Sequence, residues 1–181
     1  MKMIDLMQQL AALDKKGVYV LSNGDIAKLF PSEQEKTLEK SLQRMVAHQV
    51  LTRAAKGIYV NPAATCKSSR IIEDIAKAMR PGCFSYVSLE SILSEYGVIS
   101  QIPIDRITVM TTGASGTYDT PYGTIEFTRT KRSPADILAR TVFSKERPLR
   151  IATKEAAISD LLRVGRNVNM MNKDEPEEED A

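Results

Sequence analysis

Residues 32–60 read SEQEKTLEKSLQRMVAHQVLTRAAKGIYV, and their pattern changes from helical to extended halfway along. Ser32 and Glu35 have the spacing of a capping box, which satisfies free backbone amides at the start of a helix. The apolar residues that follow recur at helical spacing and predict one buried face on a helix over about 33–48. They are Leu38, Leu42, Met45 and Val46.

A hairpin is predicted to follow this helix. Residues 50–53 and 58–60 are rich in β-forming residues and flank a turn that contains Gly57. Ahead of the capped helix, the pattern predicts an amphipathic helix at 1–13, a short strand at 18–21 and a short helix at 26–30. The order helix, strand, helix, helix, hairpin is typical of a winged helix-turn-helix, which we expect over residues 1–62.

One side of the third helix carries a row of cations. Lys36, Lys40 and Arg44 recur every four residues, which stacks them along the helix. A major groove admits one helix and offers both phosphates and base edges. Cations can hold the phosphates while polar neighbours read the bases. The predicted DNA-binding site therefore consists of Gln34, Lys36, Thr37, Lys40, Ser41 and Arg44 on the helix, with Arg53 and Lys56 on the hairpin.

Two other interpretations of this module stay open. A row of cations on a helix is also typical of a solvated face. Winged helices also serve as protein-interaction modules, so an adaptor that ignores DNA is an alternative to a DNA-binding regulator. Salt-dependent binding to duplex DNA distinguishes these functions, because phosphate contacts release counterions.

The remainder of the chain predicts a mixed α+β domain with a smaller sheet over residues 71–166, joined by a short polar linker at 63–70. Helices are expected at 71–80, 88–95, 134–141 and after Thr153, and Ser88 and Thr153 are expected to cap the second and the last of them. Strands are expected at 83–87, 107–111, 117–118, 124–128 and 150–152. The fold class of the whole chain is therefore α+β. A fold of two parts fits a chain of 181 residues.

The formal net charge of +2 hides an acidic end. The last ten residues hold six acids and one base, so they carry −5 and leave +7 on residues 1–171. The tail at 167–181 has no apolar anchor, which predicts a disordered segment that either solubilises the protein or competes for the basic face. No apolar run approaches the ~20 residues needed to cross a membrane, and no signal layout opens the chain, so we expect a cytoplasmic protein.

A second basic stretch lies between residues 129 and 150. Seven bases and two acids give it a local charge of +5. Such an excess is typical of a solvated rim, and it is equally typical of a nucleic-acid surface. The second interpretation places an additional contact surface at Arg129, Lys131 and Arg132.

The sequence offers few candidate residues for a metal site or an enzyme active site. A structural zinc site usually needs four Cys or His ligands, and this chain has Cys66, Cys83 and His48. The residues at 113–116 lack the lysine and hydroxyl residue of a phosphate-binding loop. A metal-dependent nuclease would need an acidic cluster, for which the candidates are Asp105, Asp119 and Glu126. Scattered acids of this kind usually lie on the surface, so we expect no enzyme, no metal and no cofactor.

Three segments of the chain resemble a known family. They are Gly57-Ile58-Tyr59-Val60-Asn61-Pro62, then Tyr86-Val87-Ser88 continuing to Gly97-Val98-Ile99-Ser100-Gln101-Ile102-Pro103, and Ile151-Ala152-Thr153-Lys154-Glu155-Ala156-Ala157. In these segments the chain resembles the AbiEi family of antitoxins from type IV toxin–antitoxin systems. The resemblance covers roughly residues 5–165.

The resemblance implies a winged helix that represses its own operon and a second domain needed for the antitoxin effect. It implies a functional partner, a toxin resembling nucleotidyltransferases, which the antitoxin opposes without a stable complex. It carries over no catalytic residue. Because a single winged helix covers a short site, we expect two copies to self-associate on an inverted repeat in the promoter of the protein's own gene. The alternative is a stand-alone regulator, or an adaptor, without a toxin partner.

Overall fold

The computed structural model describes residues 1–100 and 104–165. Seven helices and nine strands occupy these residues, so the fold class is α+β, as predicted. The chain divides into two compact units: residues 1–81 together with 118–122, and residues 82–117 together with 123 onward. The predicted disordered tail at 167–181 lies outside the described residues.

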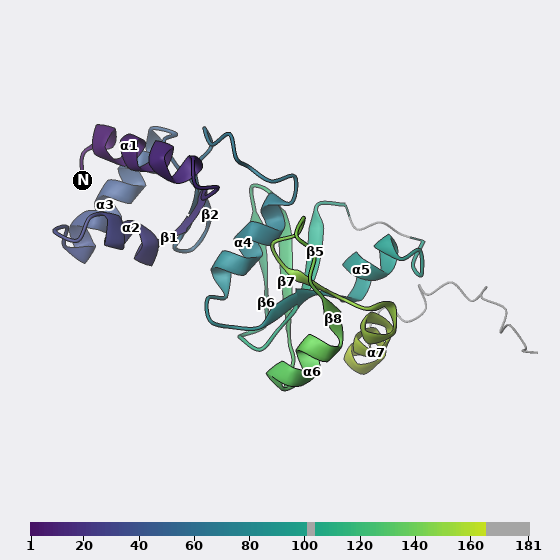
Figure 1. The fold of residues 1–181 in the computed structure, drawn as a ribbon. Helices are drawn as coiled ribbons and strands as arrows, with labels where there is room; N and C mark the ends of the chain where they lie inside the picture. The colour runs from purple at the N-terminus through teal and green to yellow at the C-terminus, as the bar shows by residue number, and fades with distance from the viewer. Residues whose placement is uncertain (101–103, 166–181) are drawn as a thin grey trace, which may run out of the picture. The chain divides into compact units, whose positions relative to one another are not determined.

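The first unit begins with a winged helix-turn-helix (Figure 1). Strand β3 lies between β1 and β2 and is antiparallel to both, so the hairpin of β2 and β3 forms the wing. A further helix, α4, packs against β1 and β3. The elements of this unit are α1 (Met3–Asp14), β1 (Val20–Ser22), α2 (Asn23–Leu29), α3 (Glu35–Ala47), β2 (Thr52–Ala55), β3 (Ile58–Val60) and α4 (Ile71–Met79).

The buried face predicted for the third helix forms the centre of this core. Leu38, Leu42 and Met45 are buried, and Val46 is partly buried. They pack with apolar residues of the other elements, namely Leu6, Leu10, Leu21, Ile26, Leu51 and Tyr59. Because burial fixes one side of α3 against this core, its opposite side is left to solvent.

A capping box starts the second helix. The Ser22 hydroxyl accepts a hydrogen bond from the Asp25 amide at 3.1 Å, and the Asp25 carboxylate accepts one from the Ser22 amide at 2.9 Å. These bonds start α2 at Asn23. The Ser22 hydroxyl, which donates to the Asp25 carboxylate at 2.6 Å, and then the Ser22 amide hold the pKa of that carboxyl below its usual value. The predicted box of Ser32 and Glu35 is wrong. Residues 31–33 form a turn, so α3 starts at Glu35 itself, and its N-cap position is occupied by Gln34, which makes no capping bond.

The third helix ends in a Schellman motif. The Val50 amide donates to the Met45 carbonyl at 2.9 Å, and the Gln49 amide donates to the Val46 carbonyl at 3.0 Å. The motif requires a left-handed residue, usually glycine, after the C-cap. Here Gln49 takes that conformation with φ 59°, so the turn that leaves α3 carries backbone strain.

Residues 63–70 are part of the first unit, so the linker predicted there is wrong, as is the predicted domain start at residue 71. The Asp14 carboxylate at the end of α1 accepts hydrogen bonds from the Thr65 amide at 3.0 Å and from the Cys66 amide at 2.9 Å. The Tyr19 hydroxyl accepts from the Ser68 amide at 3.2 Å and donates to Asp74 on α4. Small polar residues look like a linker in the sequence, but here their amides satisfy side chains of the winged helix. The unit therefore extends to residue 81.

These contacts change the titration of the groups that make them. Hydrogen bonds from the Cys66 thiol, and then from the Thr65 and Cys66 amides, hold the pKa of the Asp14 carboxyl well below its usual value. Burial, and then the hydrogen bond to Asp74, raises the pKa of the Tyr19 phenol. Asp14 is therefore a carboxylate at neutral pH, and Tyr19 is a neutral hydroxyl.

The remainder of the chain forms a six-stranded mixed sheet, larger than the sequence suggested, with three helices (Figure 1). The strand order is β6-β7-β5-β4-β9-β8, with β5 parallel to β7 and β4 parallel to β9. Helices α5 and α7 pack together. The elements are β4 (Ser85–Val87), α5 (Leu89–Glu95), β5 (Arg106–Thr111), β6 (Gly116–Thr120), β7 (Gly123–Arg129), α6 (Pro134–Ala139), β8 (Thr141–Val142), β9 (Arg150–Ala152) and α7 (Lys154–Val164).

Two helix starts in this unit behave differently. Thr153 caps α7 as predicted, because its hydroxyl accepts from the Ala156 amide at 3.2 Å. Ser88 precedes α5 but makes no capping bond, contrary to the prediction. Its hydroxyl donates instead to Asp160 on α7 at 3.0 Å. The buried carboxylate is the stronger acceptor for this hydroxyl, since charge strengthens a hydrogen bond.

Candidate nucleic-acid interface

The exposed side of α3 presents a stripe of polar and cationic side chains. Successive residues of a helix are offset by about 100°, so positions separated by four, seven and eleven residues lie along one side. Lys36, Lys40, Gln43 and Ala47 have this spacing, and all four are exposed. Thr37 and Arg44 lie beside them and are also exposed. The structure therefore brings together most of the helix residues predicted from the sequence.

The two lysines of this stripe hold no partner within residues 1–100 and 104–165, where neither Lys36 nor Lys40 makes a hydrogen bond or ion pair. Arg44 is positioned differently. Its guanidinium donates to the main-chain carbonyl of Met1 at 3.2 Å. Arginine has five N–H donors, so this bond orients the guanidinium and leaves its other donors available. Two free lysines and an oriented arginine are suited to phosphate contacts.

Ser41 is not available for DNA contact, which corrects the sequence prediction. Its exposed fraction is 6%, because position 41 falls beside Leu38 and Leu42 on the core side of α3. The sequence argument missed Gln43, which is exposed within the stripe. The signal was present, since Gln43 lies seven residues after Lys36 and three after Lys40. Gln34, also predicted, is exposed at the N-cap of α3.

These placements predict that Gln43→Ala weakens DNA binding and that Ser41→Ala leaves it nearly unchanged. Ser41→Ala should change DNA affinity by no more than about twofold, the effect of an uninvolved position. Gln43→Ala should cost about 1–3 kcal/mol on the specific site if the amide reads a base. Titration of both variants against specific and random duplexes measures the difference. A larger loss in Ser41→Ala than in Gln43→Ala would contradict the assignment.

The wing is short and carries the two predicted cations. Arg53 on β2 and Lys56 at the turn are exposed. Gly57 completes the turn with φ 74°, a conformation that favours glycine. The Gly57 carbonyl accepts from the Asn23 amide at 2.9 Å, which ties the wing to the start of α2. The wing is thus fixed by the helix-turn-helix itself.

One side of α3 is acidic and limits how DNA can approach. A pocket of about 400 Å³ lies between α2 and α3, and it is lined by Glu33, Glu35 and Glu39 among others. Glu33 pairs with the Met1 ammonium, and Arg44 donates to the carbonyl of the same residue, so Glu33 lies near Arg44. Glu35 and Glu39 of α3 would repel phosphates, so a duplex at this helix would have to follow the side that carries Lys36 and Lys40. Burial raises the pKa of the Tyr59 phenol, while Arg53 lowers it and Glu39 raises it. Arg53 therefore lies close enough to this acidic flank for both charges to act on one side chain.

The second basic surface predicted at residues 129–132 is only partly present. Arg129 and Lys131 are exposed, but Arg132 is partly buried, with 18% of its side chain exposed. Its guanidinium donates to Asp160 at 3.0 Å, and Asp160 has an exposed fraction of 0%. The same carboxylate accepts from Tyr86 and Ser88 at 3.0 Å each. Arg132 is a structural residue, because a buried carboxylate needs a cation and donors around it.

Other arginines of this basic stretch are also bound internally. Arg140 donates to the Ala156 carbonyl, Arg150 to Thr141, and Arg147 pairs with Glu95 at 2.7 Å. Four of the seven bases counted in this stretch, including Arg132, therefore bind groups within the second unit. Burial, and then Asp160, raises the pKa of the Tyr86 phenol to about 12, so Tyr86 remains a hydrogen-bond donor to Asp160 at neutral pH.

The described residues offer no alternative centre for metal chemistry. Within residues 1–100 and 104–165, no three His, Cys, Asp or Glu side chains gather where they could hold a metal ion. Of the three acids considered for a nuclease site, Glu126 pairs with Arg106 at 3.3 Å. In the same residues, no helix has the length and apolarity needed to span a membrane.

Comparison with known proteins supports the fold and leaves the activity open. A family model described as "Family of unknown function (DUF6088)" matches residues 7–152. Among solved structures, the RV2827C protein from Mycobacterium tuberculosis is similar, with a TM-score of 0.55 and 13% identity. The alignment covers 84% of this chain and 58% of that one, so this chain spans little more than half of that protein. No curated protein matches the sequence.

Proposed function

The chain belongs to this family of unknown function, DUF6088, and we propose that it is a DNA-binding repressor of its own promoter that also acts as an antitoxin. One observation carries the DNA-binding part. The third helix of a winged helix-turn-helix exposes Lys36, Lys40 and Arg44 on the side away from the core, with Gln43 between them. Arg53 and Lys56 add two exposed cations on the wing.

The physical case rests on the chemistry of a major groove. A helix of this width fits the groove, its cations neutralise phosphates, and its amides and hydroxyls read base edges. Glu35 and Glu39 support the same orientation, because they line the pocket beside α2 and lie outside the cationic stripe. An adaptor function would require no such separation of charge around one helix.

The antitoxin part rests on the resemblance to the AbiEi family. Two of the segments that carry it lie side by side in the second unit. Tyr86 and Val87 of β4 pair in parallel with Arg150 and Ile151 of β9. Ser88 and Asp160 then join β4 to α7. These pairings lie in the core of the unit, so they support a fold shared with the family. The proposed partner is a nucleotidyltransferase-like toxin, opposed in the cytoplasm without a stable complex.

Footprinting and growth measurements test the two parts separately. On DNA from upstream of its own gene, we expect protection of an inverted repeat whose half-sites lie about 10 base pairs, or a multiple of that, apart. In cells that express a nucleotidyltransferase-like toxin from the same operon, we expect the full chain to restore growth. Absence of protection at low salt would favour the adaptor. Protection without rescue would favour a stand-alone regulator.

A further inference from the structure

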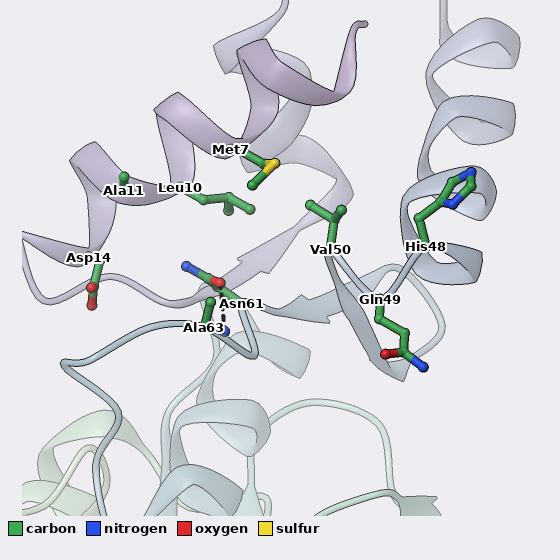
Figure 2. Close-up of a pocket in the computed structure, with 9 residues that line it drawn as sticks. All are labelled: Met7, Leu10, Ala11, Asp14, His48, Gln49, Val50, Asn61 and Ala63. Carbon is green, nitrogen blue, oxygen red and sulfur yellow. Dashed lines mark hydrogen bonds between the residues drawn. The ribbon is translucent and has the colours of Figure 1, made fainter.

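The winged helix contains a pocket that is lined by none of the residues proposed to contact DNA. Its volume is about 450 Å³, which falls within the range of ~300–1,000 Å³ for small-molecule sites. One wall is the side of α1 that carries Met7, Leu10 and Ala11 (Figure 2). The other walls are the turn after α3 and the segment from Asn61 to Ala63. All of these residues belong to the first unit.

A buried side-chain amide faces this pocket with half of its hydrogen bonding unmet. Asn61 has an exposed fraction of 5%, and its Oδ1 accepts from the Ala63 amide at 3.1 Å. That bond fixes which end of the amide is nitrogen. The nitrogen has no acceptor within residues 1–100 and 104–165. Figure 2 shows it directed toward α1. The nitrogen is not one of the fully buried polar atoms that lack a partner in the described residues. It is therefore open to the pocket and can donate to a molecule that enters it.

The remaining lining determines the chemistry of that ligand. Its apolar part comes from Met7, Leu10, Ala11, Val50 and Ala63, and its polar part from Asp14, His48, Gln49 and Asn61. The one carboxylate, Asp14, has both oxygens occupied by amides of residues 65 and 66 and remains ionised. Its negative charge disfavours an anionic ligand. The site therefore suits a molecule that is uncharged, mainly apolar and equipped with one hydrogen-bond acceptor.

We propose that this pocket binds a small neutral molecule whose carbonyl oxygen or ring nitrogen accepts the free Asn61 N–H. The pocket also touches the strained turn at Gln49, which ends the helix proposed to enter DNA. Strained residues often lie at ligand-controlled positions. Occupancy should therefore change DNA affinity, a consequence that rests on the proposed function, whereas the binding itself does not.

Nile red is a suitable probe, because it is neutral, apolar and carries a carbonyl acceptor. With the full chain and no DNA, we expect a saturable rise in its fluorescence with one site per chain, and a shift of the Asn61 side-chain amide resonances in NMR spectra. Asn61→Asp keeps the acceptor for Ala63 and removes the donor. It should weaken binding about tenfold or more, as expected where a site loses a buried hydrogen bond.

A second pair of variants leaves Asn61 intact. Ala11 and Ala12 are both exposed on α1, but only Ala11 lines the pocket. Ala11→Leu should fill the pocket and abolish saturable binding, while Ala12→Leu should leave it within about twofold, as for other uninvolved surface positions. Equal binding by these two variants, or no saturable binding to the unmodified chain, would overturn the proposal. So would self-association that Ala11→Leu abolishes, because a second copy would then occupy the pocket.

The link to DNA is measured separately. Saturating Nile red should change the affinity for the upstream duplex by at least about threefold, near the lower end of typical coupling between sites. This effect should vanish in Ala11→Leu. If the protein fails to bind DNA, the proposed function fails while probe binding remains measurable. If DNA binds but the probe does not, the pocket proposal alone fails.

Discussion

Replacing Arg132 by glutamate is expected to lower the free energy of unfolding by about 3–5 kcal/mol, the range for breaking a buried ion pair. Arg132 is the cation paired with Asp160, whose exposed fraction is 0%. The substitution removes a donor at 3.0 Å and places a second carboxylate beside the first. Tyr86 and Ser88 would still donate to Asp160, but two hydroxyls do not neutralise its charge.

The neighbouring residue provides a matched control. Lys131 is exposed, so Lys131→Glu makes the same change in charge one position away and should alter the free energy of unfolding by no more than about 0.5 kcal/mol. Urea denaturation of both variants measures the difference. Failure of Arg132→Glu to fold while Lys131→Glu folds agrees with the prediction. Equal free energies of unfolding for the two variants would contradict the prediction and would show that Arg132 behaves as a solvated residue.

The ion pair between Arg132 and Asp160 also affects the design of any test for a second nucleic-acid surface. A charge reversal that included Arg132 would lose function by unfolding the unit, whatever this surface binds. Arg129 and Lys131 are exposed, so they can be reversed without disturbing Asp160. They are the appropriate positions at which to ask whether this region contacts nucleic acid.

The double substitution Lys36→Ala with Lys40→Ala is expected to weaken DNA binding roughly 60-fold near 0.1 M salt. The estimate follows from counterion release. Each phosphate contact contributes about 0.9 to the slope of log affinity against log salt, which is about eightfold in affinity between ~1 M and ~0.1 M salt. If the five exposed cations of α3 and the wing each meet a phosphate, the unmodified chain should have a slope near about −4.5 and the variant near about −2.7.

A salt titration of the variant against a matched control checks this. Lys15 and Lys16 follow α1 and are exposed, so Lys15→Ala with Lys16→Ala removes the same charge from a different part of the unit. We expect its slope to stay near that of the unmodified chain. Identical slopes for the two double variants would show that net charge, rather than the α3 stripe, governs binding.

The sequence by itself determined the local features. Apolar spacing located α3 and its buried face, and β-rich runs around Gly57 located the wing. The cationic row was evident for the same reason, since side chains four residues apart must lie on one side of a helix. These predictions needed only neighbours along the chain, and the order of elements then followed for a winged helix-turn-helix.

Only the tertiary structure decided which polar residues are available. Arg132 and Lys131 look alike in the sequence, but Asp160, 28 positions away, holds Arg132 in an ion pair and leaves Lys131 exposed. Thr65 belongs to the winged helix because Asp14, 51 positions earlier, accepts its amide. Ser41 carries a polar side chain that its position on α3 turns toward the core. For Arg132 and Thr65 a partner distant in sequence sets the environment, and local pattern carries no information about which distant group will provide the compensating charge or hydrogen bond.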